Sequence, residues 1–146
     1  MVAIYYAGPL DCPYGYSPIL TRCFKLTDAL DWFTALSSCQ SSGGTLATIT
    51  SLSENNALFD FVRSKGNFQA VWIGYKREYN GGPFVWVDGS TSTFTNWNSE
   101  EPSNGNGVEI VAEMRIVWNG TWNDMSSSYG FPGLCSIKSI SKSSYG

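Results

Sequence analysis

Val71-Trp72-Ile73-Gly74 and Phe84-Val85-Trp86-Val87 are the two stretches that decide the fold of this 146-residue chain. Each is a short aliphatic and aromatic run bounded by Gly, Pro, Asn or Asp, a pattern typical of short β-strands. Residues 114–118 and 134–137 have a similar composition and are expected to form the closing strands. The second half of the chain is therefore predicted to be a β-sheet.

Two helices are predicted before these strands. The first covers residues 27–40, with Thr27 as N-cap and Gly43-Gly44 as the stop signal. Its apolar residues recur at helical spacing and form one stripe, which consists of Ala29, Trp32, Phe33, Leu36 and Cys39.

The second helix is predicted to begin near Ser51, because Ser51-Leu52-Ser53-Glu54 fits a capping box. Helices followed by strands indicate an α+β domain, in which the helices are segregated from an antiparallel sheet. Residues 88–107 have little periodic pattern, and so long a loop in a compact domain is usually functional or disordered.

Cysteines, charge and the missing histidine limit the function classes. The cysteines are Cys12, Cys23, Cys39 and Cys135. An even number without a C-x-x-C pair favours two disulfides and an oxidising compartment, whereas four free thiols in a cytosolic protein are the alternative. A single sequon at Asn119-Gly120-Thr121 is consistent with secretion.

The chain has no histidine, which excludes any mechanism that needs an imidazole. Its net charge of −3 does not favour binding to nucleic acid. The sequence has no basic cluster that would bind an anionic membrane, and a membrane span is not expected. The first residues are too short and uncharged for a signal peptide, so we expect a mature chain. The expected organisation is an N-terminal extension (1–10), one domain (11–138) and a flexible Ser-rich tail (139–146).

These motifs, in this order, resemble a C-type lectin-like domain over residues 11–138. Cys12-Pro13 with Cys23-Phe24 resembles the N-terminal hairpin of that family, and Trp72-Ile73-Gly74-Tyr75 resembles its core motif. The run from Phe84 to Ser90 and the pair Asn96-Trp97 follow as in the family. The resemblance implies the C-type lectin-like fold, two disulfides (Cys12–Cys23 and Cys39–Cys135), secretion and glycan recognition of the kind used in innate immunity.

The sugar-binding members of that family hold Ca²⁺ with residues that correspond here to Glu101, Ser103, Glu109, Asn123 and Asp124, which we call the predicted site. Carboxylate, amide and hydroxyl oxygens are the ligands that Ca²⁺ prefers. A second alignment would instead leave Gly105 at the position of Glu109; the first fits both flanks. It puts Val111 and Ser127 where the family has a further disulfide, so the loop is expected to be held by packing and Ca²⁺.

The predicted function is therefore calcium-dependent carbohydrate binding, with mannose-type sugars weakly favoured by Glu101 over galactose-type ones. Ser103 departs from the amide of the mannose-type pattern, because a hydroxyl lacks the two amide donors. The alternative is a C-type lectin-like domain that binds a protein partner or surface without calcium or sugar. An enzyme, such as a two-carboxylate glycosidase, is not expected. Homo-oligomerisation, which would raise avidity, stays open.

Overall fold

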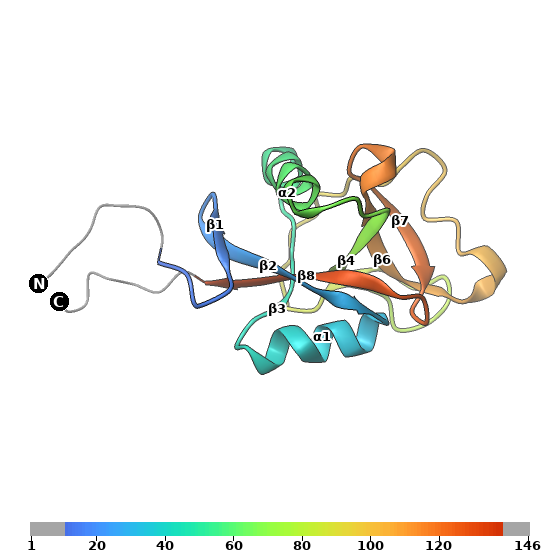
Figure 1. Ribbon diagram of the computed structural model, residues 1–146. Helices are drawn as coiled ribbons and strands as arrows, with labels where there is room; N and C mark the ends of the chain where they lie inside the picture. The colour runs from blue at the N-terminus through green and yellow to red at the C-terminus, as the bar shows by residue number, and fades with distance from the viewer. Residues whose placement is uncertain (1–10, 139–146) are drawn as a thin grey trace, which may run out of the picture.

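The computed structural model describes residues 11–138 (Figure 1). The predicted extension at 1–10 and the predicted tail at 139–146 lie outside the described residues. The elements are β1 (Ser17–Ile19), β2 (Arg22–Leu30), α1 (Trp32–Ser41), β3 (Thr45–Leu46), α2 (Leu52–Lys65), β4 (Ala70–Lys76), β5 (Val85–Trp86), η1 (Gly105–Gly107), β6 (Glu109–Arg115), η2 (Ile116–Trp118), β7 (Thr121–Ser126) and β8 (Phe131–Lys138).

The strands form one sheet with the order β1-β2-β8-β4-β6-β7, to which β3 and β5 add at β8 and β4. The predicted α+β class is confirmed. The pairings are antiparallel except for β4 with β8, which run parallel at Trp72 and Gly133, so the sheet is mixed. Helices α1 and α2 lie on opposite sides of β2 and β8, and the long β5–β6 connection projects from the end of the molecule opposite the β1–β2 hairpin (Figure 1).

The first helix begins later than predicted. Residues 27–30 belong to β2, and the side chain of Asp31, not of Thr27, caps the helix by accepting from the backbone N–H of Thr34. Thr27 instead uses its hydroxyl to accept from the backbone N–H of Gly133 at 2.8 Å. The apolar face differs as well, because Ala35 is buried while Phe33 is exposed.

The second helix begins as predicted. The Ser51 hydroxyl accepts from the backbone N–H of Glu54, as in a capping box. The Glu54 carboxylate reaches back one residue further than the motif requires, to the backbone N–H of Thr50, and also pairs with Arg22.

Tryptophan side chains connect the two halves of the fold. The indole of Trp32 donates to the carbonyl oxygen of Ile73 at 2.9 Å, and the indole of Trp72 donates to that of Leu30 at 2.8 Å. Both rings are fully buried. Gly74 is required in β4, because a Cβ there would lie 2.5 Å from the carbonyl oxygen of Leu46.

Both predicted disulfides are present. Cys12–Cys23 closes the β1–β2 hairpin, and Cys39–Cys135 joins α1 to β8. The closing strands differ slightly from prediction, because β6 ends at Arg115 and residues 116–118 form a 3-10 turn. Among the described residues, no helix has the length and apolar character needed to cross a bilayer.

The two disulfides should stabilise the fold unequally. Their sequence separations are 96 for Cys39–Cys135 and 11 for Cys12–Cys23. In the chain-entropy model, loops of these sizes contribute about 4.7 and about 2.8 kcal/mol to the free energy of unfolding. We expect urea unfolding of the Cys39→Ala/Cys135→Ala variant to show the larger loss; an equal or larger loss for Cys12→Ala/Cys23→Ala would contradict this ranking.

Candidate functional site

Strand β7 carries the last two residues of the predicted site. The alternation of side chains along a strand puts Trp122 and Asp124 on one face and Asn123 on the other. Trp122 is fully buried, and its indole donates to the Asn55 side chain at 2.8 Å. Its backbone carbonyl accepts from the N–H of Asn98, so the same residue also holds the middle of the long loop.

Four residues of the predicted site are joined by hydrogen bonds around the backbone of the loop. The N–H of Ser103 donates to Asp124 Oδ1 at 2.9 Å and to Glu101 Oε1 at 3.1 Å. The Ser103 hydroxyl donates to Glu109 Oε1 at 3.2 Å, and the N–H of Gly105 donates to the same oxygen at 2.6 Å. The structure therefore brings together Glu101, Ser103, Glu109 and Asp124.

Asn123 belongs to a different hydrogen-bond network. Its amide nitrogen donates to Glu113 Oε2 at 2.8 Å, and Arg115 pairs with the same oxygen at 3.0 Å. Glu113 is fully buried, and its other oxygen has no partner among the described residues. Because the amide nitrogen is engaged, the carbonyl oxygen is the atom that Asn123 can offer to a ligand.

Arg77 contacts the predicted site, and nothing in the sequence indicated this contact. It follows β4 directly, and its guanidinium lies 3.0 Å from Asp124 Oδ2. The same side chain donates to the backbone carbonyl of Glu109 through Nε at 3.1 Å and through Nη2 at 2.9 Å. No motif marks this residue, since it lies 47 positions before its carboxylate partner.

The loop is therefore held by more than packing. Both Asp124 oxygens accept from the loop backbone, Oδ1 from Ser103 and Oδ2 from Asn104 at 2.7 Å, while Arg77 pairs with Oδ2. This corrects the expectation that packing and Ca²⁺ alone hold a loop that lacks the disulfide at Val111 and Ser127.

The pKa values of Glu101 and Glu109, in the predicted site, and of the neighbouring Glu113 are all raised. Partial burial and, next, the neighbouring Asp124 raise the pKa of Glu101. Burial also raises the pKa of Glu109, with a further rise from Asp124, although the Gly105 N–H lowers it. Burial raises the pKa of Glu113 against the opposing effect of Asn123 and Arg115. Anions crowded in this way favour a nearby cation.

The donor set suits Ca²⁺ chemically, because it consists of carboxylate, hydroxyl and amide oxygens. The residues that would hold the ion are those of the predicted site. Within residues 11–138, however, no three or more His, Cys, Asp or Glu side chains are arranged as a metal-binding group. Binding of a cation would therefore require the carboxylates to exchange some of their hydrogen bonds to the loop backbone.

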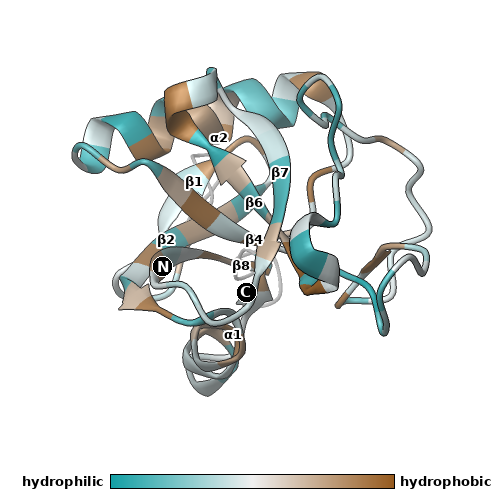
Figure 2. Ribbon diagram, turned by 90° about the vertical axis from the view of Figure 1, so that its right-hand side faces the viewer, coloured by the Kyte–Doolittle hydropathy of each residue, from teal (hydrophilic) through white to brown (hydrophobic). Residues whose placement is uncertain are grey.

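Other polar and aromatic residues near the loop have simpler roles. Asn98 and Thr121 bond to each other through their side chains, and Glu100 is exposed. Tyr75 is buried against Trp86, whereas Tyr79 and Tyr129 are exposed. Figure 2 faces this end of the molecule and shows hydrophilic loop segments beside strands with hydrophobic stretches.

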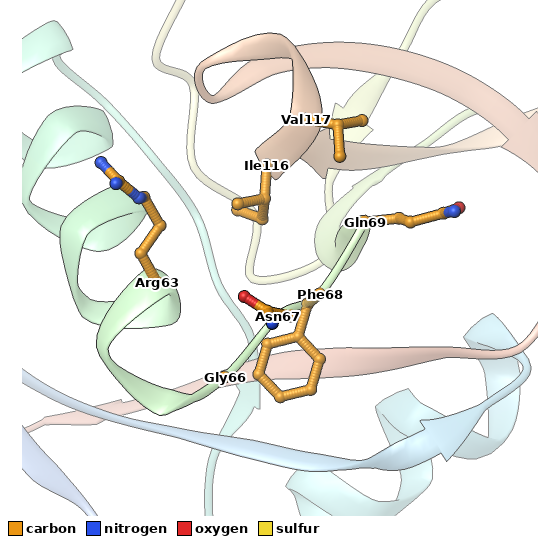
Figure 3. Close-up of a pocket in the computed structure, with 7 residues that line it drawn as sticks. All are labelled: Arg63, Gly66, Asn67, Phe68, Gln69, Ile116 and Val117. Carbon is orange, nitrogen blue, oxygen red and sulfur yellow. The ribbon is translucent and has the colours of Figure 1, made fainter.

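A pocket of about 420 Å³ lies elsewhere, between the end of α2, the start of β4 and η2 (Figure 3). Its lining comprises Arg63, Gly66, Asn67, Phe68, Gln69, Ile116 and Val117. None of these residues belongs to the predicted site, so the pocket is a separate surface feature.

Comparison with protein families decides the classification. Residues 28–137 match the model described as "Lectin C-type domain". The chain belongs to the C-type lectin family. This family is non-enzymatic, in line with the expectation that the protein is not an enzyme.

This C-type lectin domain is 33% identical over 129 residues to a lectin of Pleurodeles waltl, a match that covers 86% of the chain and 75% of that protein. It is similar in structure to the C-type lectin CEL-I from Cucumaria echinata, with a TM-score of 0.80, 27% identity and coverage of 86% and 96%. It is also similar to a calcium-independent type II antifreeze protein, with a TM-score of 0.79, 25% identity and coverage of 92% and 100%.

The buried ion pair of this C-type lectin domain predicts a large effect of Asp124→Ala. The variant would remove the carboxylate partner of Arg77 and the acceptor of two loop N–H groups, and loss of one partner of a buried pair costs about 3–5 kcal/mol. We expect urea unfolding in EDTA to show this loss of stability. Glu109→Ala removes a partly exposed carboxylate and serves as the control, so it should lower the free energy of unfolding less. Equal losses of stability in the two variants would contradict a stabilising role of the buried Arg77–Asp124 pair.

Proposed function

We propose that this protein binds carbohydrate in a Ca²⁺-dependent manner at the predicted site. Family membership supports carbohydrate binding. The observation that carries the calcium proposal is the meeting of three carboxylates, from Glu101, Glu109 and Asp124, around the backbone of Ser103 and Gly105. Glu101 and Glu109 lie at the two ends of one loop and Asp124 lies on β7, and an oxygen of each accepts from a backbone N–H of that loop.

The chain's own groups have defined tasks in this proposal. Bound Ca²⁺ would supply the positive charge that offsets the carboxylates and would coordinate sugar hydroxyls. Glu101 and Glu109 accept hydrogen bonds from those hydroxyls, while Asn123 offers its carbonyl oxygen, which Glu113 orients by binding the amide nitrogen. Asp124 is fully buried, so its task is to hold the loop by accepting from its N–H groups and to contribute negative charge beneath the ion.

Sugar preference depends on Ser103. Its hydroxyl already donates to Glu109, so it does not supply the two donors that an amide would. We propose a preference for mannose-type over galactose-type sugars, on the basis of Glu101 in the Glu101-Pro102 pair, weakened by Ser103.

A second function, binding of a protein partner or surface without calcium, is favoured by one observation. Asp124 is already paired with Arg77, so part of the charge that would attract a cation is balanced within the chain. We also propose that the protein is secreted, because two disulfides suit an oxidising compartment. A role in innate immunity stays a prediction.

Calcium should stabilise the native protein and support sugar binding. Because the ion binds the folded site and not the unfolded chain, Ca²⁺ at 100 times its Kd should add about 2.7 kcal/mol to the free energy of unfolding. We expect a higher Tm in Ca²⁺ than in EDTA, and elution from mannose-agarose by EDTA.

The matched variants are Glu109→Gln and Glu100→Gln. Glu109 lies in the predicted site, whereas Glu100 is an exposed carboxylate on the same loop. Glu109→Gln should lose both effects of Ca²⁺, and Glu100→Gln should keep them. Sugar retention that persists in EDTA, or a Tm that does not respond to Ca²⁺, would favour the calcium-free function.

Ser103→Asn tests the role of position 103. The amide adds two donors and a stronger oxygen ligand at a position whose N–H lies between Glu101 and Asp124. We expect tighter Ca²⁺ binding by calorimetry and a glycan-array profile shifted toward mannose-type sugars. Unchanged calcium affinity and an unchanged array profile would place residue 103 outside the site.

A further inference from the structure

We propose that Arg77 is a positioning residue, a built-in cation that keeps the ligand-binding loop in its folded shape when no Ca²⁺ is bound. The loop in question comprises residues 101–109. This inference rests on the proposed function for the identity of the loop as ligand-binding, but the contacts that support it involve only the protein chain.

The guanidinium group of Arg77 is held in one orientation by several contacts. The side chain is 6% exposed. It donates through Nε and Nη2 to the carbonyl oxygen of Glu109, and Nη2 also donates to Asp124 Oδ2. The ring of Phe84 lies against the guanidinium, with its centroid 4.6 Å from Cζ. A planar guanidinium held at a carboxylate, a carbonyl and an aromatic face has little freedom to move.

These contacts join three separate parts of the chain. Arg77 follows β4, Asp124 lies within β7, and Glu109 opens β6 where the loop ends. Of the ion pairs formed by residues 11–138, the one that reaches a carboxylate of the predicted site is Arg77 with Asp124. Arg77 therefore supplies positive charge at the place where the proposed Ca²⁺ would also act.

Asp124 transmits this constraint to the loop. With Oδ2 bound by Arg77, its carboxylate accepts from the N–H groups of Ser103 and Asn104. Asn104 has a left-handed backbone with φ of 54°, a conformation that Asn adopts more readily than most residues, and its side-chain oxygen is buried with no hydrogen-bond partner among the described residues. The same Arg77 side chain fixes the other end of the loop through Glu109.

The test is residue-resolved amide exchange by NMR in EDTA and without sugar. In the wild-type protein, the N–H groups of Ser103 and Asn104 should exchange at least about tenfold more slowly than in an unstructured peptide. Arg77→Met should remove this protection, while amides of β2 and β8 keep theirs. Lys76→Met removes a neighbouring positive charge that pairs with exposed Glu78 and should leave the loop unchanged.

Arg77→Lys is the conservative variant, because it keeps the charge but not the planar fork, and its loop protection should be intermediate. Unprotected loop amides in the wild-type protein in EDTA would overturn the inference, as would unchanged protection in Arg77→Met. If Arg77→Met does not fold, the loop protection of the wild-type protein and its partial loss in Arg77→Lys still test the role of Arg77. Adding Ca²⁺ to Arg77→Met should restore protection; failure of this step alone would overturn the calcium site and not the role of Arg77.

Discussion

The fully buried carboxylate of Asp124 is the constraint on which the ligand-binding end of this domain depends. A buried charge is tolerated only when it is paired and hydrogen-bonded. Asp124 meets this requirement with Arg77 and with the N–H groups of Ser103 and Asn104. A loop with little regular structure therefore becomes part of the interior hydrogen-bonding of the fold, and its path is set by the need to satisfy one side chain.

The position of Asp124 depends in turn on the aromatic core. Trp122 lies on the same face of β7, packs against Trp86 and Trp97, and bonds to Asn55 of α2. Strand alternation then directs Asp124 toward the loop and Asn123 toward Glu113. The Trp-Asn-Asp run thus serves the core, a buried polar network and the site with three consecutive residues, which explains why neighbouring residues in sequence have such different surroundings.

Local patterns in the sequence were sufficient for much of the fold. The Ser51 cap was predicted, because short-range spacing decides such a feature. The start of α1 was predicted wrongly, since β2 pairs with β8 through residue 30 and this tertiary pairing overrides the capping potential of Thr27. Four site residues were predicted to lie together and do so, whereas Arg77 and Glu113 carry no local signal and are visible only once β4, β6 and β7 are adjacent.

An internal cation changes what a bound ion has to do. If Arg77 already orders residues 101–109, the entropic cost of ordering the loop is offset during folding. Less of the free energy of Ca²⁺ binding is then needed to fix the loop. The ion must instead compete with backbone N–H groups for the carboxylate oxygens and approach a guanidinium of like charge. Loop order and calcium affinity are then separate properties of this domain. The first follows from Arg77 and Asp124, and the second from how readily Glu101 and Glu109, the more exposed carboxylates, give up their present donors.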